Sequence, residues 1–390
     1  MKRDFIVIAA IADIHLGNKA ISWKEYKHQL KNGVLKKLDA MAFLDGIVLC
    51  GDISHYQISM NSEYATVYQW FFAKLVKIAK NKNAFIRVFR GTRSHDLDQL
   101  ETVRQYEDDF DIDFKIYNTA TVETINGYNF AFIPEEYIDK SVDKYYSDIF
   151  DREDGYFDMI FGHGLIKETQ FIEQKSENID NRAPIFNLKD LYRVCRGPIL
   201  FGHIHTPMVF GNKFYYIGST LRTCHGEEED KGWDVVSYIK DKELYRVDKI
   251  VNEFTFNFNK LEIHNKFIED NEVDAIVNYV EKFIDKNNVD RLSLRIQCID
   301  NDDNALKIEL LKKYFAKNKN ISTSFKIMSQ KAYEKDEKIS KVKEKKKYLQ
   351  DGLDIAERIR LWALEKRNYR IEKDRIMKFI TDDGLKRKGV

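Results

Sequence analysis

The chain has 390 residues, of which 43% are apolar and 13% aromatic, and its 64 Lys and Arg nearly balance its 63 Asp and Glu. This composition excludes wholesale disorder, and the length predicts two or three domains. Because no apolar stretch reaches 18 residues and the N-terminus lacks a small-residue cleavage site, we expect a cytoplasmic protein that does not associate with membranes.

Five short apolar runs in the first 250 residues each end abruptly in a polar cluster that contains Gly, Asp or His. The runs and their clusters cover residues 5–17, 45–55, 84–96, 157–164 and 198–205. Such runs, apolar at consecutive positions, are typical of strands covered on both faces. Segments with helical periodicity lie between them at about 24–41 and 62–80, so we predict an α/β fold. Polar clusters just past strand ends are where such sheets bind ligands.

A second, compact α/β unit is predicted over residues 254–330. Expected strands at 254–263, 290–299 and 322–328 alternate there with expected helices at 274–284 and 305–317. Residues 331–350 read as a charged linker, and residues 351–390 as a helical segment with two short amphipathic helices. Residues 331–390 hold 19 Lys and Arg against 12 Asp and Glu, a net charge of +7. This segment either docks on the body of the protein or binds a partner.

Most of the histidines fall in the strand-end clusters. Six of them recur at the same topological place, namely His15, His55, His95, His163, His203 and His205. With Asp13 and Asp52 they offer imidazole and carboxylate groups, a mixed donor set that suits Mn, Fe or Zn better than Ca. One carboxylate between two such clusters can bridge a pair of metal ions that activate water and hold a phosphoryl group.

The strand-end clusters contain five short motifs in a fixed order, DIHLG (13–17), GDISH (51–55), SHD (94–96), GHG (162–164) and GHIH (202–205). These motifs resemble those of the calcineurin-like metallophosphoesterase superfamily. DIHLG, the spacing from Asp52 to His55, and YIGSTLR followed by KGW are similar to the SbcD type of DNA-repair nuclease, which includes phage recombination nucleases. The resemblance implies a two-sheet sandwich flanked by helices over residues 1–250, a small α/β DNA-capping domain over 254–330, and C-terminal helices.

The resemblance also implies a role for each matched residue. Asp13, His15 and His205 would bind one metal ion, Asp52 would bridge, and His163 and His203 would bind the second ion, with manganese as the expected metal. His95 would orient the phosphate and protonate the leaving oxygen, and His55 would position the DNA backbone. At the position where the family has an Asn metal ligand, this sequence reads GTRSHD, so Ser94 is the expected ligand there. Asp96 and Asp98 are candidates for fixing histidine tautomers, with ordinary loop residues as the alternative.

The implied function is a manganese-dependent DNA nuclease, a 3′-5′ exonuclease on duplex ends and an endonuclease on single strands. It would act as a homodimer with an SbcC-like, SMC-type ATPase bound through residues 351–381, in the host cytoplasm if the chain is phage-encoded. Tyr64, Tyr68 and Phe71 are candidates for the dimer interface, with core packing as the alternative. Two other functions stay open. One is another metallophosphoesterase, either a protein phosphatase or a cyclic-nucleotide phosphodiesterase, and the other is a catalytically weak scaffold that binds DNA and the ATPase.

Overall fold

The computed structural model describes residues 4–333, apart from residues 97, 110, 140, 152–155, 170–182, 226 and 228. The chain divides into two compact units, of which the first comprises Met1–Asn259 with Asn288–Arg291. The second comprises Lys260–Asn287 and the residues from Leu292 onward. The expected helical segment at 351–390, and the linker before it from residue 334 on, lie outside the described residues. Within the described part, no helix is long and apolar enough to cross a membrane.

The first sheet of unit one has six strands in the order β14-β13-β1-β2-β3-β4. They are β1 (Ile6–Ile11), β2 (Gly46–Cys50), β3 (Phe85–Phe89), β4 (Phe114–Tyr117), β13 (Gly232–Ile239) and β14 (Leu244–Val251). Strands β1 to β4 run parallel, whereas β13 is antiparallel to β1. The predicted strands at 5–17, 45–55 and 84–96 are confirmed as β1, β2 and β3, each followed by its polar cluster.

The second sheet also has six strands, in the order β11-β12-β10-β7-β6-β5. They are β5 (Thr121–Ile125), β6 (Tyr128–Ile133), β7 (Met159–His163), β10 (Ile199–Gly202), β11 (Met208–Phe210) and β12 (Phe214–Tyr216). Strands β6, β7 and β10 run parallel. A separate parallel pair joins β8 (Leu165–Ile166) to β9 (Ile185–Phe186).

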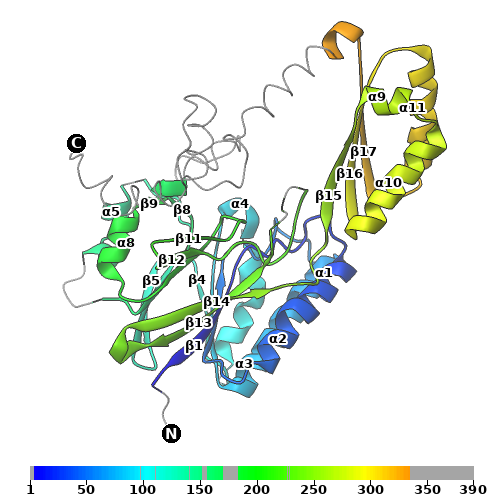
Figure 1. The fold of residues 1–390 in the computed structure, drawn as a ribbon. Coiled ribbons are helices and arrows are strands. Elements are labelled where there is room, and N and C mark those ends of the chain that lie inside the picture. Colours follow the sequence, from blue (N-terminus) through cyan, green and yellow to red (C-terminus); the bar gives the residue numbers. More distant parts are fainter. Residues whose placement is uncertain are drawn as a thin grey trace, which may run out of the picture. The chain divides into compact units, whose positions relative to one another are not determined.

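Helices cover the outer faces of both sheets (Figure 1). The first sheet carries α1 (Trp23–Leu30), the π-helical turn η1 (Lys31–Leu35), α2 (Lys36–Ala40) and α3 (Glu63–Lys82). The second carries α6 (Ser147–Phe150) and α8 (Leu188–Val194), with α5 (Val142–Tyr145) before them. Shorter turns are α4 (Arg93–Asp96), η2 (Gln99–Asp108), η3 (Lys167–Thr169) and η4 (Lys240–Lys242).

The alternation of side chains along β1 explains why it is apolar at every position. Val7, Ala9 and Ile11 pack toward α1 and α3, while Ile6, Ile8 and Ala10 pack into a core shared with the second sheet. That shared core also holds Val48 of β2 and Phe132 of β6, so the two sheets pack face to face. The prediction of an α/β fold is therefore confirmed.

Two of the three aromatic residues considered for a dimer interface belong to the core instead. Tyr68 and Phe71, both on α3, are fully buried. Tyr64 is partly buried, and its hydroxyl donates a hydrogen bond to the carbonyl of Ile21 at 2.8 Å. Core packing, the alternative interpretation, is therefore correct for Tyr68 and Phe71.

The second unit is built on a three-stranded sheet in the order β15-β16-β17. Its elements are β15 (Phe258–Ile263), α9 (Asn265–Glu269), α10 (Val273–Asn287), β16 (Arg291–Ile299), α11 (Asp302–Phe315) and β17 (Ile321–Met328). Ile276 and Val280 of α10, Leu311 of α11, and Leu294 and Ile296 of β16 are all buried. The strands and helices predicted for residues 254–330 are present in the predicted order.

Candidate metal centre

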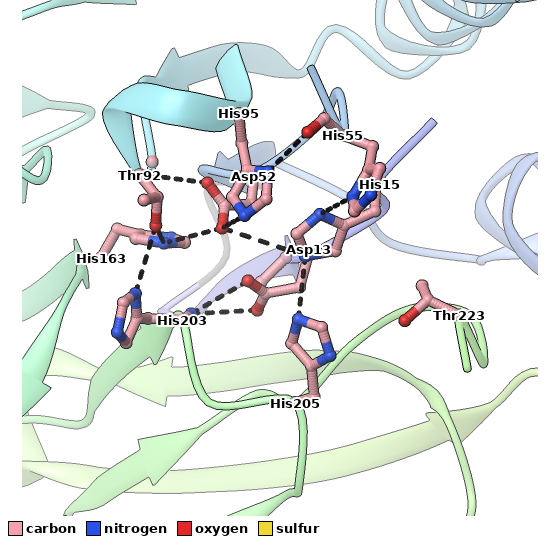
Figure 2. A network of polar contacts seen from close by, with 12 residues as sticks. Asp13, His15, Asp52, His55, Thr92, His95, His163, His203, His205 and Thr223 are labelled. Atoms are coloured by element: carbon pink, nitrogen blue, oxygen red, sulfur yellow. Dashed lines mark hydrogen bonds and ion pairs between the residues drawn. The ribbon is translucent and has the colours of Figure 1, made fainter. Parts of the chain in front are cut away.

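Histidines and carboxylates from several strand ends meet at one place in the first unit. Strands β1, β2 and β3 of the first sheet and β6, β7 and β10 of the second run parallel within their sheets. Their carboxyl ends carry the polar clusters, as expected for ligand sites of parallel sheets. Figure 2 shows Asp13, His15, His95 and His163 grouped around Asp52, whereas Thr223 stands apart.

Asp52 lies at the centre of the cluster. Its Oδ2 atom is 3.4 Å from Nε2 of His163 and 3.9 Å from Nε2 of both His15 and His95. The Thr92 N–H donates to its Oδ1 at 2.6 Å. Burial raises the pKa of Asp52, but the imidazoles, with His163 foremost, lower it well below its usual range. The carboxylate is therefore ionised and shared by three rings.

Asp13, His15 and His205 form one group beside Asp52. Their candidate ligand atoms all lie within 4.8 Å of one another. The Nε2 atoms of His15 and His205 are only 2.8 Å apart. His205 donates its Nδ1–H to Glu227 at 2.7 Å, so the neutral ring has its lone pair on Nε2. Burial, and then His205, lower the pKa of His15 well below its ordinary value, so His15 can present a lone pair to a cation. Burial also lowers the pKa of His205, but the hydrogen bond to Glu227 raises it overall, so a cation would have to displace the second proton of this ring.

His163 and His203 form the second group. His163 is fully buried and places Nδ1 2.8 Å from the carbonyl of Cys50, which fixes the proton on Nδ1 and directs the Nε2 lone pair toward Asp52. Burial lowers the pKa of His163, but the negative charge of Asp52 raises it to about 9, so without a metal ion Nε2 carries a proton, which a bound cation would replace. The side chain of Thr92 lies between the two rings, with Oγ1 3.3 Å from Nδ1 of His203 and 3.4 Å from Nε2 of His163.

His95 and His55 stand at the rim of the cluster. Nδ1 of His95 lies 2.6 Å from the carbonyl of His55, so it carries the proton and Nε2 faces Asp52. The two rings stack with their centroids 5.3 Å apart. Nδ1 of His55 is 3.4 Å from Nδ1 of His15. Burial and His95 lower the pKa of His55. Both rings thus border the cluster without being enclosed in it.

Asp96 holds the loop that presents Asp52. Its fully buried carboxylate accepts backbone N–H groups of Asp52, Ile53, Ser54 and Gly91, all at 2.9 to 3.0 Å. Burial, and then Asp52, raise the pKa of Asp96 to about 6, so the group is ionised at neutral pH. Asp98 is exposed. Of the two candidates for supporting the site, only Asp96 contacts it, and it fixes the backbone around Asp52 rather than the tautomer of a histidine.

Four residues of the cluster have a left-handed backbone conformation. The φ angles are 51° at Asp13, 50° at His15, 50° at Asp52 and 90° at His203. Non-glycine residues rarely adopt this region, and such strain clusters at functional sites. A close approach adds to it, because a Cβ at Gly91 would come within 2.3 Å of Oδ1 of Asp52. The backbone of this region is shaped to bring these side chains together.

The structure corrects the expectation for Ser94. Ser94 is exposed on α4. Thr92, one residue after Gly91, takes the place between His163 and His203 instead. The sequence expectation counted one residue back from His95, but the position is set by the end of β3, and α4 turns Ser94 away toward solvent.

Two further carboxylates were not predicted from the sequence. Glu135 follows β6, and its Oε2 lies 3.1 Å from Nδ1 of His203. Glu227, in the loop before β13, accepts Nδ1–H of His205 and the N–H of Thr223 at 2.6 Å. Both are mostly buried. Glu135 follows the apolar run FAFI directly after Pro134, so the strand-end rule could have found it, whereas Glu227 lies in no such pattern.

The donor set fits divalent transition ions. Asp13, Asp52 and His163 are almost completely buried, and their ligand atoms also lie within 4.8 Å of one another. Buried carboxylates and imidazole lone pairs that face one another need a shared cation. We conclude that these residues could hold a metal ion.

Glu227→Gln is expected to weaken Mn²⁺ binding by about 10-fold, because an outer carboxylate that orients a metal-binding histidine contributes that much to affinity. Titration calorimetry with Mn²⁺ measures the change. Glu229→Gln is the matched control, since Glu229 in the same loop contacts Thr206 and Lys231 rather than a histidine. Equal affinities in the two variants would show that Glu227 does not support His205.

Comparisons with known proteins do not identify a family. No family model matches the sequence, and no curated protein matches it. Solved structures are similar in part: TT1561 of Thermus thermophilus (10% identity, 63% of this chain and 99% of that chain, TM-score 0.35) and GAP50, the anchor in the inner membrane complex of Plasmodium (13%, 63% and 89%, 0.37). AQ665 from Aquifex aeolicus, a protein of unknown function, has 17% identity over 47% of this chain and 89% of that chain, with a TM-score of 0.24. Similarities this low say nothing about function.

Proposed function

We propose that the chain is a phosphoesterase that depends on two divalent metal ions, and that its substrate is DNA. The observation that carries the proposal is the position of Asp52 between two sets of ligand atoms. Asp52 Oδ2 lies near Nε2 of His15 on one side and near Nε2 of His163 on the other. Two bound ions would lower the pKa of a bound water and would supply positive charge for in-line phosphoester hydrolysis.

The residues around this centre have distinct tasks in the proposed reaction. Asp13, Asp52 and the four inner histidines bind and place the ions. His95 keeps its Nδ1 proton on the carbonyl of His55, so its Nε2 faces the centre. In the protonated ring Nε2 would hold the second proton and would pass it to the leaving oxygen, which leaves His95 neutral. His55, stacked on His95, stands where it can contact the phosphate backbone.

DNA is proposed as the substrate on the strength of the motif resemblance. The two-sheet core with helices outside, the second α/β unit and the basic C-terminal segment all agree with the architecture expected for an SbcD-type nuclease. Manganese, the homodimer and an SbcC-like ATPase partner are part of the same proposal. The segment proposed to bind that ATPase, residues 351–381, lies outside the described residues.

A labelled duplex tests the proposal against its alternatives. We expect Mn²⁺-dependent release of nucleotides from a duplex labelled at its 3′ ends, and cleavage of circular single-stranded DNA. Efficient hydrolysis of a phosphoprotein or a cyclic nucleotide without DNA degradation would favour the other metallophosphoesterases. DNA binding without any cleavage would favour the scaffold.

Removal of metal is expected to abolish hydrolysis. Chelation with EDTA should reduce the rate to background, and Mn²⁺ added in excess should restore it, because the proposed nucleophile forms only on bound ions. Initial rates on the labelled duplex measure both steps. Circular dichroism of the chelated protein provides the control, since the sheets that carry the ligands have their own apolar cores. Unchanged hydrolysis after exhaustive chelation would contradict a metal-dependent mechanism.

A further inference from the structure

The second ligand group contains a residue that is poorly suited to its position. Thr92 lies between His163 and His203, with Oγ1 within 3.4 Å of a nitrogen of each ring (Figure 2). Carboxylate and carbonyl oxygens are the oxygen donors that suit Mn²⁺. A threonine side chain offers only a neutral hydroxyl, so this group lacks a strong oxygen donor besides Asp52.

Glu135 brings a carboxylate to the same place from the second sheet. Its N–H donates to the carbonyl of Arg90 at 3.3 Å, which ties it to the end of β3. The residue is only 2% exposed, and Oε2 lies 3.1 Å from Nδ1 of His203. The candidate ligand atoms of Glu135, His163 and His203 all lie within 4.8 Å of one another. One ion can therefore contact all three side chains.

The position of Glu135 differs from that of a carboxylate that only orients a ring. Glu227 binds Nδ1 of His205, and the opposite nitrogen of that ring faces His15. Glu135 instead lies beside Nδ1 of His203, the same nitrogen that faces Thr92. Glu135 is therefore on the inner side of its histidine, whereas Glu227 is on the outer side.

The surroundings of Glu135 also leave its charge to be balanced at the centre. No Lys or Arg of the described residues forms an ion pair with it, and a buried carboxylate requires a cation nearby. The adjacent Glu136 shows the contrast, because its two oxygens accept hydrogen bonds from Ala120 N–H and the Tyr145 hydroxyl.

We propose that Glu135 is a ligand of the second metal ion, together with Asp52, His163 and His203, and that it supplies the strong oxygen donor that Thr92 does not. This inference rests on the proposed two-metal function. It predicts that an amide oxygen introduced at residue 92 can replace the carboxylate of Glu135.

Manganese content tests the assignment without reference to activity. The full-length chain and its variants are dialysed against Mn²⁺, and the bound metal per chain is measured by mass spectrometry over a range of free Mn²⁺. We expect the wild-type chain to bind two ions. Glu135→Ala should lower the affinity for the second ion by more than about 100-fold, which exceeds the effect of losing a carboxylate that only orients a ligand. Glu135→Gln keeps an oxygen donor and the side-chain volume, and should weaken it less.

The double variant Thr92→Asn with Glu135→Ala is expected to recover the second ion. Glu136→Gln is the matched control and should bind two ions, because Glu136 is also buried and belongs to no ligand group. Unchanged Mn²⁺ affinity in Glu135→Ala would overturn the assignment. It would also be overturned if the double variant unfolds at the wild-type temperature in EDTA but does not regain the second ion. A wild-type chain that binds no Mn²⁺ would instead contradict the two-metal proposal itself.

Discussion

Asp52→Asn is expected to reduce metal-dependent hydrolysis by about 1,000-fold or more. One carboxylate oxygen of Asp52 lies near Nε2 of His15, His95 and His163 at once, at 3.4 to 3.9 Å. An amide has one oxygen and no charge, so it can neither bridge two ions nor balance their charge. Initial rates on the 3′-labelled duplex at saturating Mn²⁺ measure the loss.

Manganese content and thermal unfolding in EDTA separate a lost bridge from a lost fold. The Asp52→Asn chain should unfold at a temperature close to that of wild type and bind at most one ion per chain. A variant that binds two ions and retains more than about a tenth of the rate would show that Asp52 does not bridge.

Asp96→Asn is expected to lower the free energy of unfolding by about 2 to 6 kcal/mol. One oxygen of Asp96 accepts N–H groups of Ile53 and Ser54, and the other accepts those of Asp52 and Gly91. The amide NH₂ cannot accept a hydrogen bond, so two buried N–H groups lose their partner, at about 1 to 3 kcal/mol each. Urea denaturation in EDTA measures the difference.

Asp98→Asn is the matched control for Asp96→Asn, because Asp98 is two residues away and exposed. It should leave both stability and hydrolysis unchanged. We also expect Asp96→Asn to slow hydrolysis at temperatures where it is folded, because the loop that presents Asp52 loses its anchor. A change in stability below about 1 kcal/mol would contradict the assigned role of Asp96.

The strand-end rule predicted which distant residues would meet. His15 and His205 are 190 residues apart in sequence, yet their Nε2 atoms are 2.8 Å apart. Each residue follows a buried strand that runs parallel to its neighbours, which placed it at a carboxyl end of its own sheet. Because β1 and β10 belong to different sheets, the contact also depends on the two sheets packing face to face. The apolar runs were long enough to identify β1, β2, β3, β7 and β10 without any knowledge of pairing.

The sequence was less informative where a site residue depends on a local turn or on an unmarked strand. Ser94 and Thr92 are both hydroxyl residues two positions apart, and only the start of α4 at Arg93 decides which one faces His163. Glu227 lies in the acidic run GEEED, where its neighbours are chemically equivalent. Its role depends on a loop conformation that no periodicity encodes.

The left-handed backbone at Asp13, His15, Asp52 and His203 has an evolutionary consequence. A side chain in this conformation costs roughly 1 kcal/mol or more relative to glycine, which adopts it freely. Glycine would therefore relieve the backbone strain at all four positions in any descendant that no longer binds metal. Asp or His retained at these positions across descendants would be a signature of selection on the bound ions and against the stability of the chain.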